Sequence, residues 1–229
     1  HVIEEILEYR VDAIVSASVP LSSPLADRCQ SAGIPVVQFN RVQERSGFSS
    51  VTTDNFAGGK AVAQHLVAED YHSFGYIAGW EGASTQRDRE AGYRKGLAEA
   101  VFEMCCRAVG NFRSEQAREA VFQILEARNR PDALFVANDA MALIVLDVLR
   151  HECGLRVPED IAVVGYDNIP PASWPSYALT SFSQPADAMV EATVDVLIKH
   201  IENDYALRDE RVIEGALVIR GSSRSRKEI

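Results

Sequence analysis

The sequence of 229 residues contains no apolar run approaching the roughly eighteen residues that a membrane-spanning helix needs. It is also short of positive charge, because 23 lysines and arginines stand against 33 aspartates and glutamates and the formal net charge is −10. Surfaces that hold DNA or an anionic membrane are basic. This segment is therefore not expected to bind either by itself. Residues 1–5 are acidic and amphipathic and do not resemble a signal peptide.

Cysteine and histidine, the softer metal ligands, are scarce and scattered. The four cysteines form no Cys-x-x-Cys pair, and a strand would point its neighbours Cys105 and Cys106 to opposite faces. The five histidines show no spacing typical of a metal site. We therefore expect reduced thiols, no metal, no cofactor and a cytoplasmic protein.

Motifs of catalysis and of phosphate binding are also missing. Gly58-Gly59-Lys60-Ala61 resembles the end of a phosphate-binding loop but lacks the first glycine and the final Ser or Thr. The glycines in residues 75–79 have the wrong spacing for a dinucleotide fingerprint, and no Gly-x-Ser-x-Gly elbow is present. Asp54 and Asp167 are possible bases, but the sequence places no nucleophile beside either. We predict no catalytic residue and no enzymatic activity.

Short β-rich runs alternate with helical patterns along almost the whole chain. Near-continuous apolar runs predict parallel strands covered on both faces, at residues 13–15, 35–39, 74–78, 133–136 and 161–164. Apolar residues at helical spacing predict helices, at Ala117–Leu125, at Met141–Leu149 behind Asn138 and Asp139 as an N-cap, and at Val190–Ile201 behind Pro185. This alternation indicates a doubly wound α/β fold.

The start of the chain fits this pattern only in part. Residues 1–10 are expected to form a helix that leads directly into the strand at residues 13–15. A parallel sheet that opens on a crossover helix lacks the strand before it. We therefore interpret the chain as truncated at its start, with one side of the strand at residues 13–15 unpaired.

Polar residues follow several predicted strands directly. Ligands of open α/β sheets bind beyond the carboxyl ends of the strands, and these ends carry an arginine, carboxylates, amides and an aromatic ring, which suit a small polar ligand such as a sugar or a nucleobase. Each Asn or Asp has an equally good second interpretation as the cap of the next helix. The segments concerned are Asn40-Arg41, residues 79–89, Phe112, Asn138-Asp139 and Asp167-Asn168.

Several segments, taken in order, resemble the LacI (lactose repressor-like) family across essentially the whole chain. Two are long and close to the family pattern, namely Pro131–Ala142 (PDALFVANDAMA) and Arg156–Asp167 (RVPEDIAVVGYD). The others are shorter, and they are VDAIV at residues 11–15, GIPVV at 33–37, TDNFAG at 53–58, REAGY at 89–93, Leu179-Thr180, Gln184-Pro185 and LVIRGS at 217–222.

The resemblance implies a type I periplasmic-binding-protein-like fold, with two doubly wound parallel-sheet lobes joined by three crossings. The crossings are expected near Thr53-Asp54, Ser183-Gln184 and Arg211-Val212. The N-terminal lobe, incomplete at its start, would then contain residues 1–53 and 184–211. The C-terminal lobe would contain residues 54–183 and 212–229.

The resemblance also implies a set of site residues. Arg89 is expected to anchor a small-molecule effector between the lobes. Asp167 and Asn138 are expected to accept hydrogen bonds from the effector and to donate hydrogen bonds to it. Phe112 is expected to stack on its ring. Asn40 and Thr85 are expected to contact the effector from the rims of the cleft between the lobes. Gln184 lies at a crossing and is expected to line the cleft.

A homodimer is the expected assembly, with contacts from Met141, Leu143, Trp174 and Tyr177. Trp174 has a second interpretation, as a loop tryptophan folded onto its own lobe. Operator DNA would be bound only by an N-terminal helix-turn-helix head that these residues lack. The resemblance thus implies the effector-sensing core of a transcriptional regulator, expected to be a repressor, with a sugar as first choice of effector and a nucleobase as second. The alternative is an exported solute-binding protein of the same fold.

Overall fold

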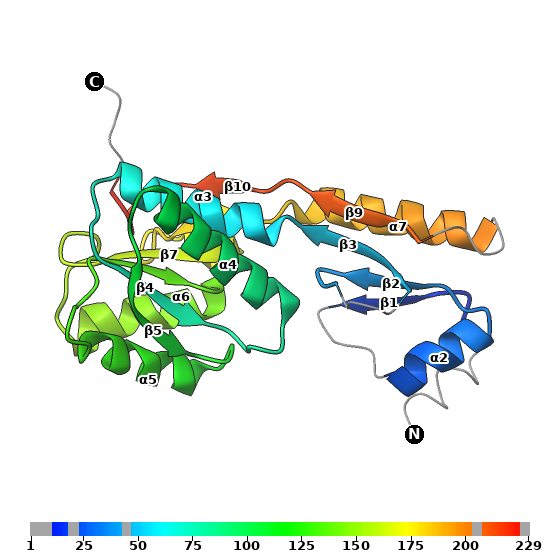
Figure 1. Cartoon of the computed structure of the whole chain (residues 1–229), viewed down its shortest axis with the longest axis horizontal. Helices are drawn as coiled ribbons and strands as arrows, with labels where there is room; N and C mark the ends of the chain where they lie inside the picture. Colours follow the sequence, from blue (N-terminus) through cyan, green and yellow to red (C-terminus); the bar gives the residue numbers. More distant parts are fainter. Residues whose placement is uncertain (1–10, 18–22, 43–46, 203–207, 225–229) are drawn as a thin grey trace. The chain divides into compact units, whose positions relative to one another are not determined.

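The chain folds into two compact units, described by a computed structural model for residues 11–17, 23–42, 47–202 and 208–224 (Figure 1). Unit 1 consists of residues 1–54 and 185–214, and unit 2 of residues 55–184 and 215–229. The last boundary follows residue 214, whereas the sequence placed a crossing at residues 211–212. The difference arises because β9 (Glu210–Ile213) continues to pair with β3 as far as Ile213. The helix expected at residues 1–10 lies outside the described residues.

The sheet of unit 1 is parallel throughout and has the order β1-β2-β3-β9. Its strands are β1 (Ile14–Ala17), β2 (Val36–Phe39), β3 (Ser49–Thr53) and β9. In the described part of the chain β1 forms the outer edge of this sheet, in agreement with the unpaired side that the sequence predicted.

Helices of unit 1 pack on both sides of this sheet. Successive residues of a strand point to opposite faces, so neighbouring residues of β2 contact different helices. Val36 belongs to a cluster with Cys29 of α2 (Ser23–Ser31). Its neighbour Val37 belongs to a second cluster, with Met189 and Val196 of α7 (Ala186–Glu202).

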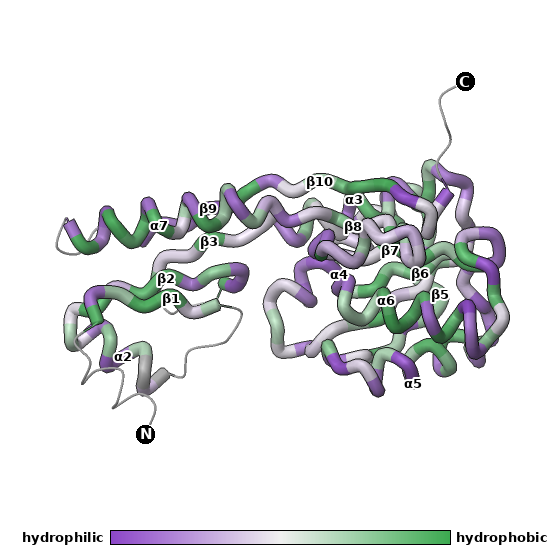
Figure 2. The backbone as a smooth tube through the Cα atoms, turned by 180° about the vertical axis from the view of Figure 1, so that it is seen from behind, coloured by the Kyte–Doolittle hydropathy of each residue, from purple (hydrophilic) through white to green (hydrophobic). Residues whose placement is uncertain are grey.

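The face that α7 buries differs from the apolar stripe seen in the sequence. Hydrophobic and hydrophilic residues alternate along the helix (Figure 2). The helix buries Met189, Thr193 and Val196, whereas Val190, Val194, Ile198 and Ile201 are exposed. Apolar residues occur on two neighbouring faces of α7, so the spacing alone did not determine which face covers the sheet.

The sheet of unit 2 has the order β10-β8-β7-β6-β4-β5 and is parallel except for β10 at its edge. Its central strands are fully buried apolar runs, as the sequence predicted. In chain order the strands are β4 (Phe74–Ala78), β5 (Met104–Val109), β6 (Ala133–Val136), β7 (Ala162–Asp167), β8 (Thr180–Ser183) and β10 (Ala216–Val218).

Helices cover both faces of this second sheet. The pair α3 (Asn55–Ala68) and α4 (Ser84–Glu99) lies on one face, with α5 (Ser114–Leu125) and α6 (Asp139–Asp147) on the other (Figure 1). Short helical turns follow at Val148–Glu152 and Pro170–Ser173. No helix among the described residues has the length and apolar character to cross a membrane. The carboxyl ends of the parallel strands meet at one edge of the sheet, where polar residues gather.

Close contact between α3 and α4 holds the base of this edge in place. A Cβ atom added to Gly59 of α3 would collide with the backbone carbonyl of Arg89, and one added to Gly92 of α4 would collide with the carbonyl of Phe56. The two helices therefore touch through their backbones, and their glycines position Arg89.

We expect Gly59→Ala to lower the free energy of unfolding by about 2 kcal/mol or more, because the methyl group must push the helices apart. In an unconstrained helix the same change would stabilise by about 1 kcal/mol, so the sign of the effect is informative. Urea unfolding followed by circular dichroism measures the difference, with the exposed Ala57→Ser on the same helix as control. A Gly59→Ala variant as stable as the wild type would contradict the close contact.

Candidate functional site

Arg89 is a buried cation held by three groups of unit 2. Only 3% of the residue is exposed. Its Nε donates to Asn55 Oδ1 at 2.8 Å, and its Nη1 donates to the Ala137 carbonyl oxygen at 2.7 Å. The guanidinium carbon lies 3.7 Å from the centroid of the Tyr166 ring. Helix α4, the start of α3 and the ends of β6 and β7 thus fix its position.

Asp167 ends β7 and faces this cation. Its Oδ1 lies 3.4 Å from Arg89 Nη2 and accepts a hydrogen bond from Gln184 Nε2 at 2.6 Å. Within the described residues Oδ2 accepts no hydrogen bond, and 26% of the side chain is exposed. Burial raises the pKa of Asp167, opposed by the charge of Arg89 and the hydrogen bond from Gln184. The backbone has φ of 113°, a strained value that is typical of functional positions.

A second carboxylate, Asp139 at the start of α6, lies beneath this turn. It is fully buried, and its two oxygens accept from the Ser181 hydroxyl at 2.7 Å and from the backbone N–H of Ile169 at 2.9 Å. A Cβ atom on Gly165 would collide with Asp139 Oδ1, so glycine is required there. Burial raises the pKa of Asp139 to about 7. The sequence offered Asp139 either as part of a ligand-binding strand end or as part of a helix cap, and it did not indicate that this carboxyl group is buried.

Asn138 performs the capping role that the sequence offered as one of two interpretations. Its Oδ1 accepts a hydrogen bond from the backbone N–H of Met141 at 3.1 Å, at the start of α6. The hydrogen bond satisfies one of the free amides of the first helical turn. Contact with a ligand through its Nδ2 stays a prediction.

Phe112 presents an aromatic ring at the same edge of the sheet. It follows β5 with φ of 59°, and a Cβ atom on Gly79 would collide with the ring, so the ring packs directly on the end of β4. More than a third of Phe112 is exposed, so the ring is accessible. Thr85, the second residue of α4, is half-buried.

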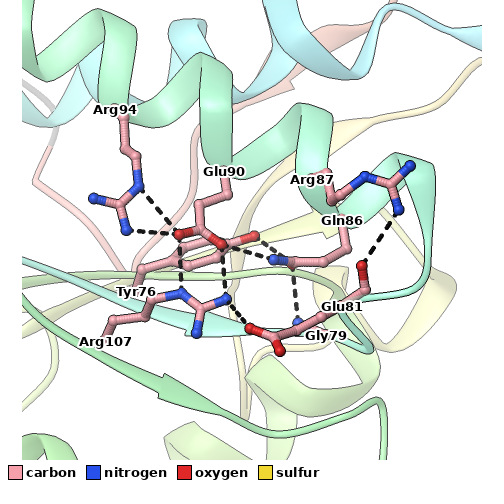
Figure 3. A network of polar contacts seen from close by, with 8 residues as sticks. All are labelled: Tyr76, Gly79, Glu81, Gln86, Arg87, Glu90, Arg94 and Arg107. Carbon is pink, nitrogen blue, oxygen red and sulfur yellow. Dashed lines mark hydrogen bonds and ion pairs between the residues drawn. The ribbon is translucent and has the colours of Figure 1, made fainter.

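A polar network fixes the segment after β4 (Figure 3). Gln86 Oε1 accepts from Gly79 N at 3.0 Å and from the Tyr76 hydroxyl at 2.7 Å, and its Nε2 donates to Glu90 at 2.9 Å. Glu90 also accepts from Arg107 at 2.9 and 3.0 Å. Burial raises the pKa of Glu90, but the hydrogen bonds from Arg107 and Arg94 outweigh it and lower the pKa. Sequence reasoning missed this network, although Gln86 and Glu90 are four residues apart on α4.

The structure therefore brings Arg89, Asp167 and Gln184 into direct contact within unit 2. Asn40 lies in unit 1, where it has φ of 55° and a buried Oδ1 without a hydrogen-bond partner among the described residues. In the described part of the chain no three His, Cys, Asp or Glu side chains are grouped so as to hold a metal ion.

The residues expected at a dimer contact differ in accessibility. Met141 is only 1% exposed and belongs to the core of unit 2, so its side chain is not available to a partner; its regular helical spacing reflects packing on the sheet. Leu143 and Tyr177 are half-buried. Trp174 is 55% exposed, so it is not folded into the core of its own unit.

Known proteins share this fold and sequence. A family model described as a periplasmic binding protein-like domain matches residues 63–223. The HTH-type transcriptional repressor PurR of Salmonella paratyphi B is 33% identical over 198 residues, which cover 85% of this chain and 58% of that protein. The chain thus spans less than two thirds of the length of the curated relatives that it matches.

Solved structures agree with the sequence matches. The transcriptional regulator CelR in its cellobiose complex is 31% identical, with a TM-score of 0.87 over 96% of this chain and 69% of that one. A sugar-binding LacI-family regulator from Escherichia coli, in complex with phosphate, is 28% identical, with a TM-score of 0.80 over 96% of this chain and 80% of that one.

The two units and the polar edge of the second sheet define a protein of the periplasmic-binding-protein-like class. Within that class, the chain belongs to the LacI family.

Proposed function

We propose that this chain is the effector-sensing core of a LacI-type DNA-binding transcriptional regulator that acts as a repressor. The two units would be its two lobes. The net charge of −10 supports a division of labour in which a separate N-terminal head binds operator DNA. The repressor PurR, 58% of which this chain covers, supports the same division. In this proposal the protein is cytoplasmic and catalyses no reaction.

The arrangement around Arg89 is the observation that carries this proposal. Of its five N–H donors, three have partners among the described residues, which leaves two for a ligand. Asp167 Oδ2 offers an acceptor and Phe112 offers a ring face. A sugar carries hydroxyls that both donate and accept, and it fits this set; the cellobiose complex of CelR supports a sugar over a nucleobase. Effector binding would shift the dimer between two geometries and so alter its affinity for the operator.

A thermal-shift screen of the full-length protein tests the effector class. We expect one or more sugars to raise the melting temperature, because a ligand present at about 100 times its Kd stabilises the native state by about 2.7 kcal/mol. Sugar phosphates and purines complete the panel. Any stabilising sugar should also change the affinity for operator DNA in a gel-shift assay. Stabilisation by purines alone would replace the sugar by a nucleobase, and conversion of the ligand during incubation would contradict a non-enzymatic role.

The proposed dimer surface contains Leu143, Trp174 and Tyr177. We expect Trp174→Glu to convert the dimer into a monomer in analytical ultracentrifugation, because a charge would be buried at an apolar contact without a partner. Val101→Glu is a matched control, since Val101 is also exposed and lies outside this surface. A Trp174→Glu variant that stays dimeric would rule out this surface.

A further inference from the structure

A hollow of about 650 Å³ opens in unit 2 beyond the ends of β4 and β5, at the same edge of the sheet as the site described above. It is lined by Trp80, Glu81, Asn111, Arg113 and Gln116. None of these five residues takes part in the contacts of Arg89 or Asp167. Phe112 forms the border, because its sequence neighbours Asn111 and Arg113 line the hollow while its ring packs on Gly79, directly before Trp80. Its volume lies within the roughly 300–1,000 Å³ that is usual for small-molecule sites.

Trp80 provides an aromatic wall whose position is fixed. A Cβ atom on Gly82 would collide with the six-membered part of the indole, so the ring packs on the backbone of its own loop. The residue is nevertheless 46% exposed, which leaves much of the ring accessible. An exposed aromatic side chain held against backbone loses little conformational entropy when a ligand packs on it.

Three polar residues of the hollow are also held in place. Asn111 Nδ2 donates to Gln116 Oε1 at 2.7 Å, which leaves Asn111 Oδ1 as an acceptor and Gln116 Nε2 as a donor. Glu81 receives a hydrogen bond from Arg107 Nη2 at 2.7 Å, as part of the network in Figure 3. Its carboxylate is largely exposed and has acceptor capacity left for ligand hydroxyls.

This combination matches the chemistry of a carbohydrate. The apolar C–H face of a sugar ring packs on an aromatic side chain, and its hydroxyls pair with carboxylates and amides. The hollow carries one acidic and one basic side chain, Glu81 and Arg113, so its charge does not favour an anion such as a phosphate group. The hollow therefore has the properties of a second sugar subsite, adjacent to the one at Arg89.

We propose that the effector is a carbohydrate of at least two units, with one unit at Arg89, Asp167 and Phe112 and the next in the hollow against Trp80. This inference rests on the proposed function and adds the chemical class and the size of the effector. Trp80 then selects for the longer sugar.

Isothermal titration of the full-length protein tests the inference. The probes are disaccharides (cellobiose, maltose, lactose and sucrose) and their component monosaccharides, titrated into wild type, Trp80→Ala, Trp80→Phe and Arg89→Ala. We expect at least one disaccharide to bind about tenfold or more tightly than either of its components. Trp80→Ala should remove that gain, leaving the affinity for the monosaccharide unchanged, and Trp80→Phe should restore most of it. Arg89→Ala should abolish binding of both.

Every other outcome overturns the inference. Equal affinity for disaccharides and monosaccharides, or a disaccharide whose binding is indifferent to Trp80→Ala, would remove the second subsite but leave the proposed function if Arg89→Ala still abolishes binding. A panel in which no sugar binds in an Arg89-dependent manner would overturn the subsite together with the proposed sugar-sensing function.

Discussion

Arg89→Ala is expected to weaken effector binding by at least about a hundredfold, which corresponds to about 2.7 kcal/mol. The reason is geometric as well as electrostatic. The guanidinium is buried, its orientation is fixed by Asn55 and the Ala137 carbonyl, and two of its N–H donors have no partner among the described residues. Removal also leaves Asp167 without the cation that opposes the rise of its pKa. Titration calorimetry with the sugar found by screening measures the loss.

Two controls separate binding from folding. Arg89→Lys keeps the charge but lacks the planar fork, so we expect an intermediate loss of affinity. Arg118→Ala removes an exposed arginine that pairs with Glu152, and it should bind the effector like the wild type. Circular dichroism of Arg89→Ala must show a folded protein. If a folded Arg89→Ala variant kept wild-type affinity, the site would have to lie elsewhere.

Asp139 is expected to make the stability of unit 2 fall as the pH rises. Its pKa is about 7 in the folded protein, against 3.8 for the unperturbed group, so the folded state binds the proton more tightly than the unfolded chain does. The stability that this proton contributes is complete below about pH 4 and is lost as the pH rises through 7. The difference between these two pKa values corresponds to a loss of up to about 4 kcal/mol in the free energy of unfolding.

Asp139→Asn provides the matched comparison, because asparagine has the same shape and no charge. Its Oδ1 can accept from Ile169 N, and its Nδ2 can donate to the Ser181 hydroxyl. Urea unfolding at several pH values should show that the wild type loses stability relative to Asp139→Asn between pH 4 and pH 8. Parallel pH profiles for the two proteins would contradict the raised pKa. Asp139→Ala should destabilise at every pH, since it leaves two buried groups without partners.

Effector affinity supplies an independent readout of the same residue. Asp139 accepts from Ile169 N, two residues after Asp167. We therefore expect Asp139→Ala to weaken effector binding as well, because the strained turn at Asp167 loses its support. The Asn variant should retain most of the affinity.

The strands that the sequence predicted well share one property. β4 and β6 are apolar on both faces, and their predicted limits agree with the structure. β3 shows the opposite case: its residues Ser49–Thr53 are all buried, but four of the five are Ser or Thr, and no hydrophobic pattern marks them. Its strand character depends on pairing with β2 and β9, and β9 lies far away in the sequence.

The candidate site divides in a similar way. Resemblance to the LacI family pointed to Arg89 and Asp167, and the structure places the two side chains in contact. The same resemblance gave no sign that Met141 would be buried in the core or that Asp139 would be a titrating group. The apolar spacing at Met141–Leu149 did indicate a buried helix face, but the titration of Asp139 depends on the elements that cover it, and no local pattern contains that information.

The sequence by itself determined the α/β class, the family and, in unit 2, the strands β4, β6 and β7 and the helices α5 and α6. It could do so because hydrophobic periodicity and turn residues act over short distances along the chain. Only the tertiary structure decided which face of α7 is buried, how Gln86 and Glu90 fix the loop after β4, and that a hollow opens beside Trp80. These features arise where distant segments meet, as when Ser181 donates to Asp139, and the burial created there sets the charge state of each group.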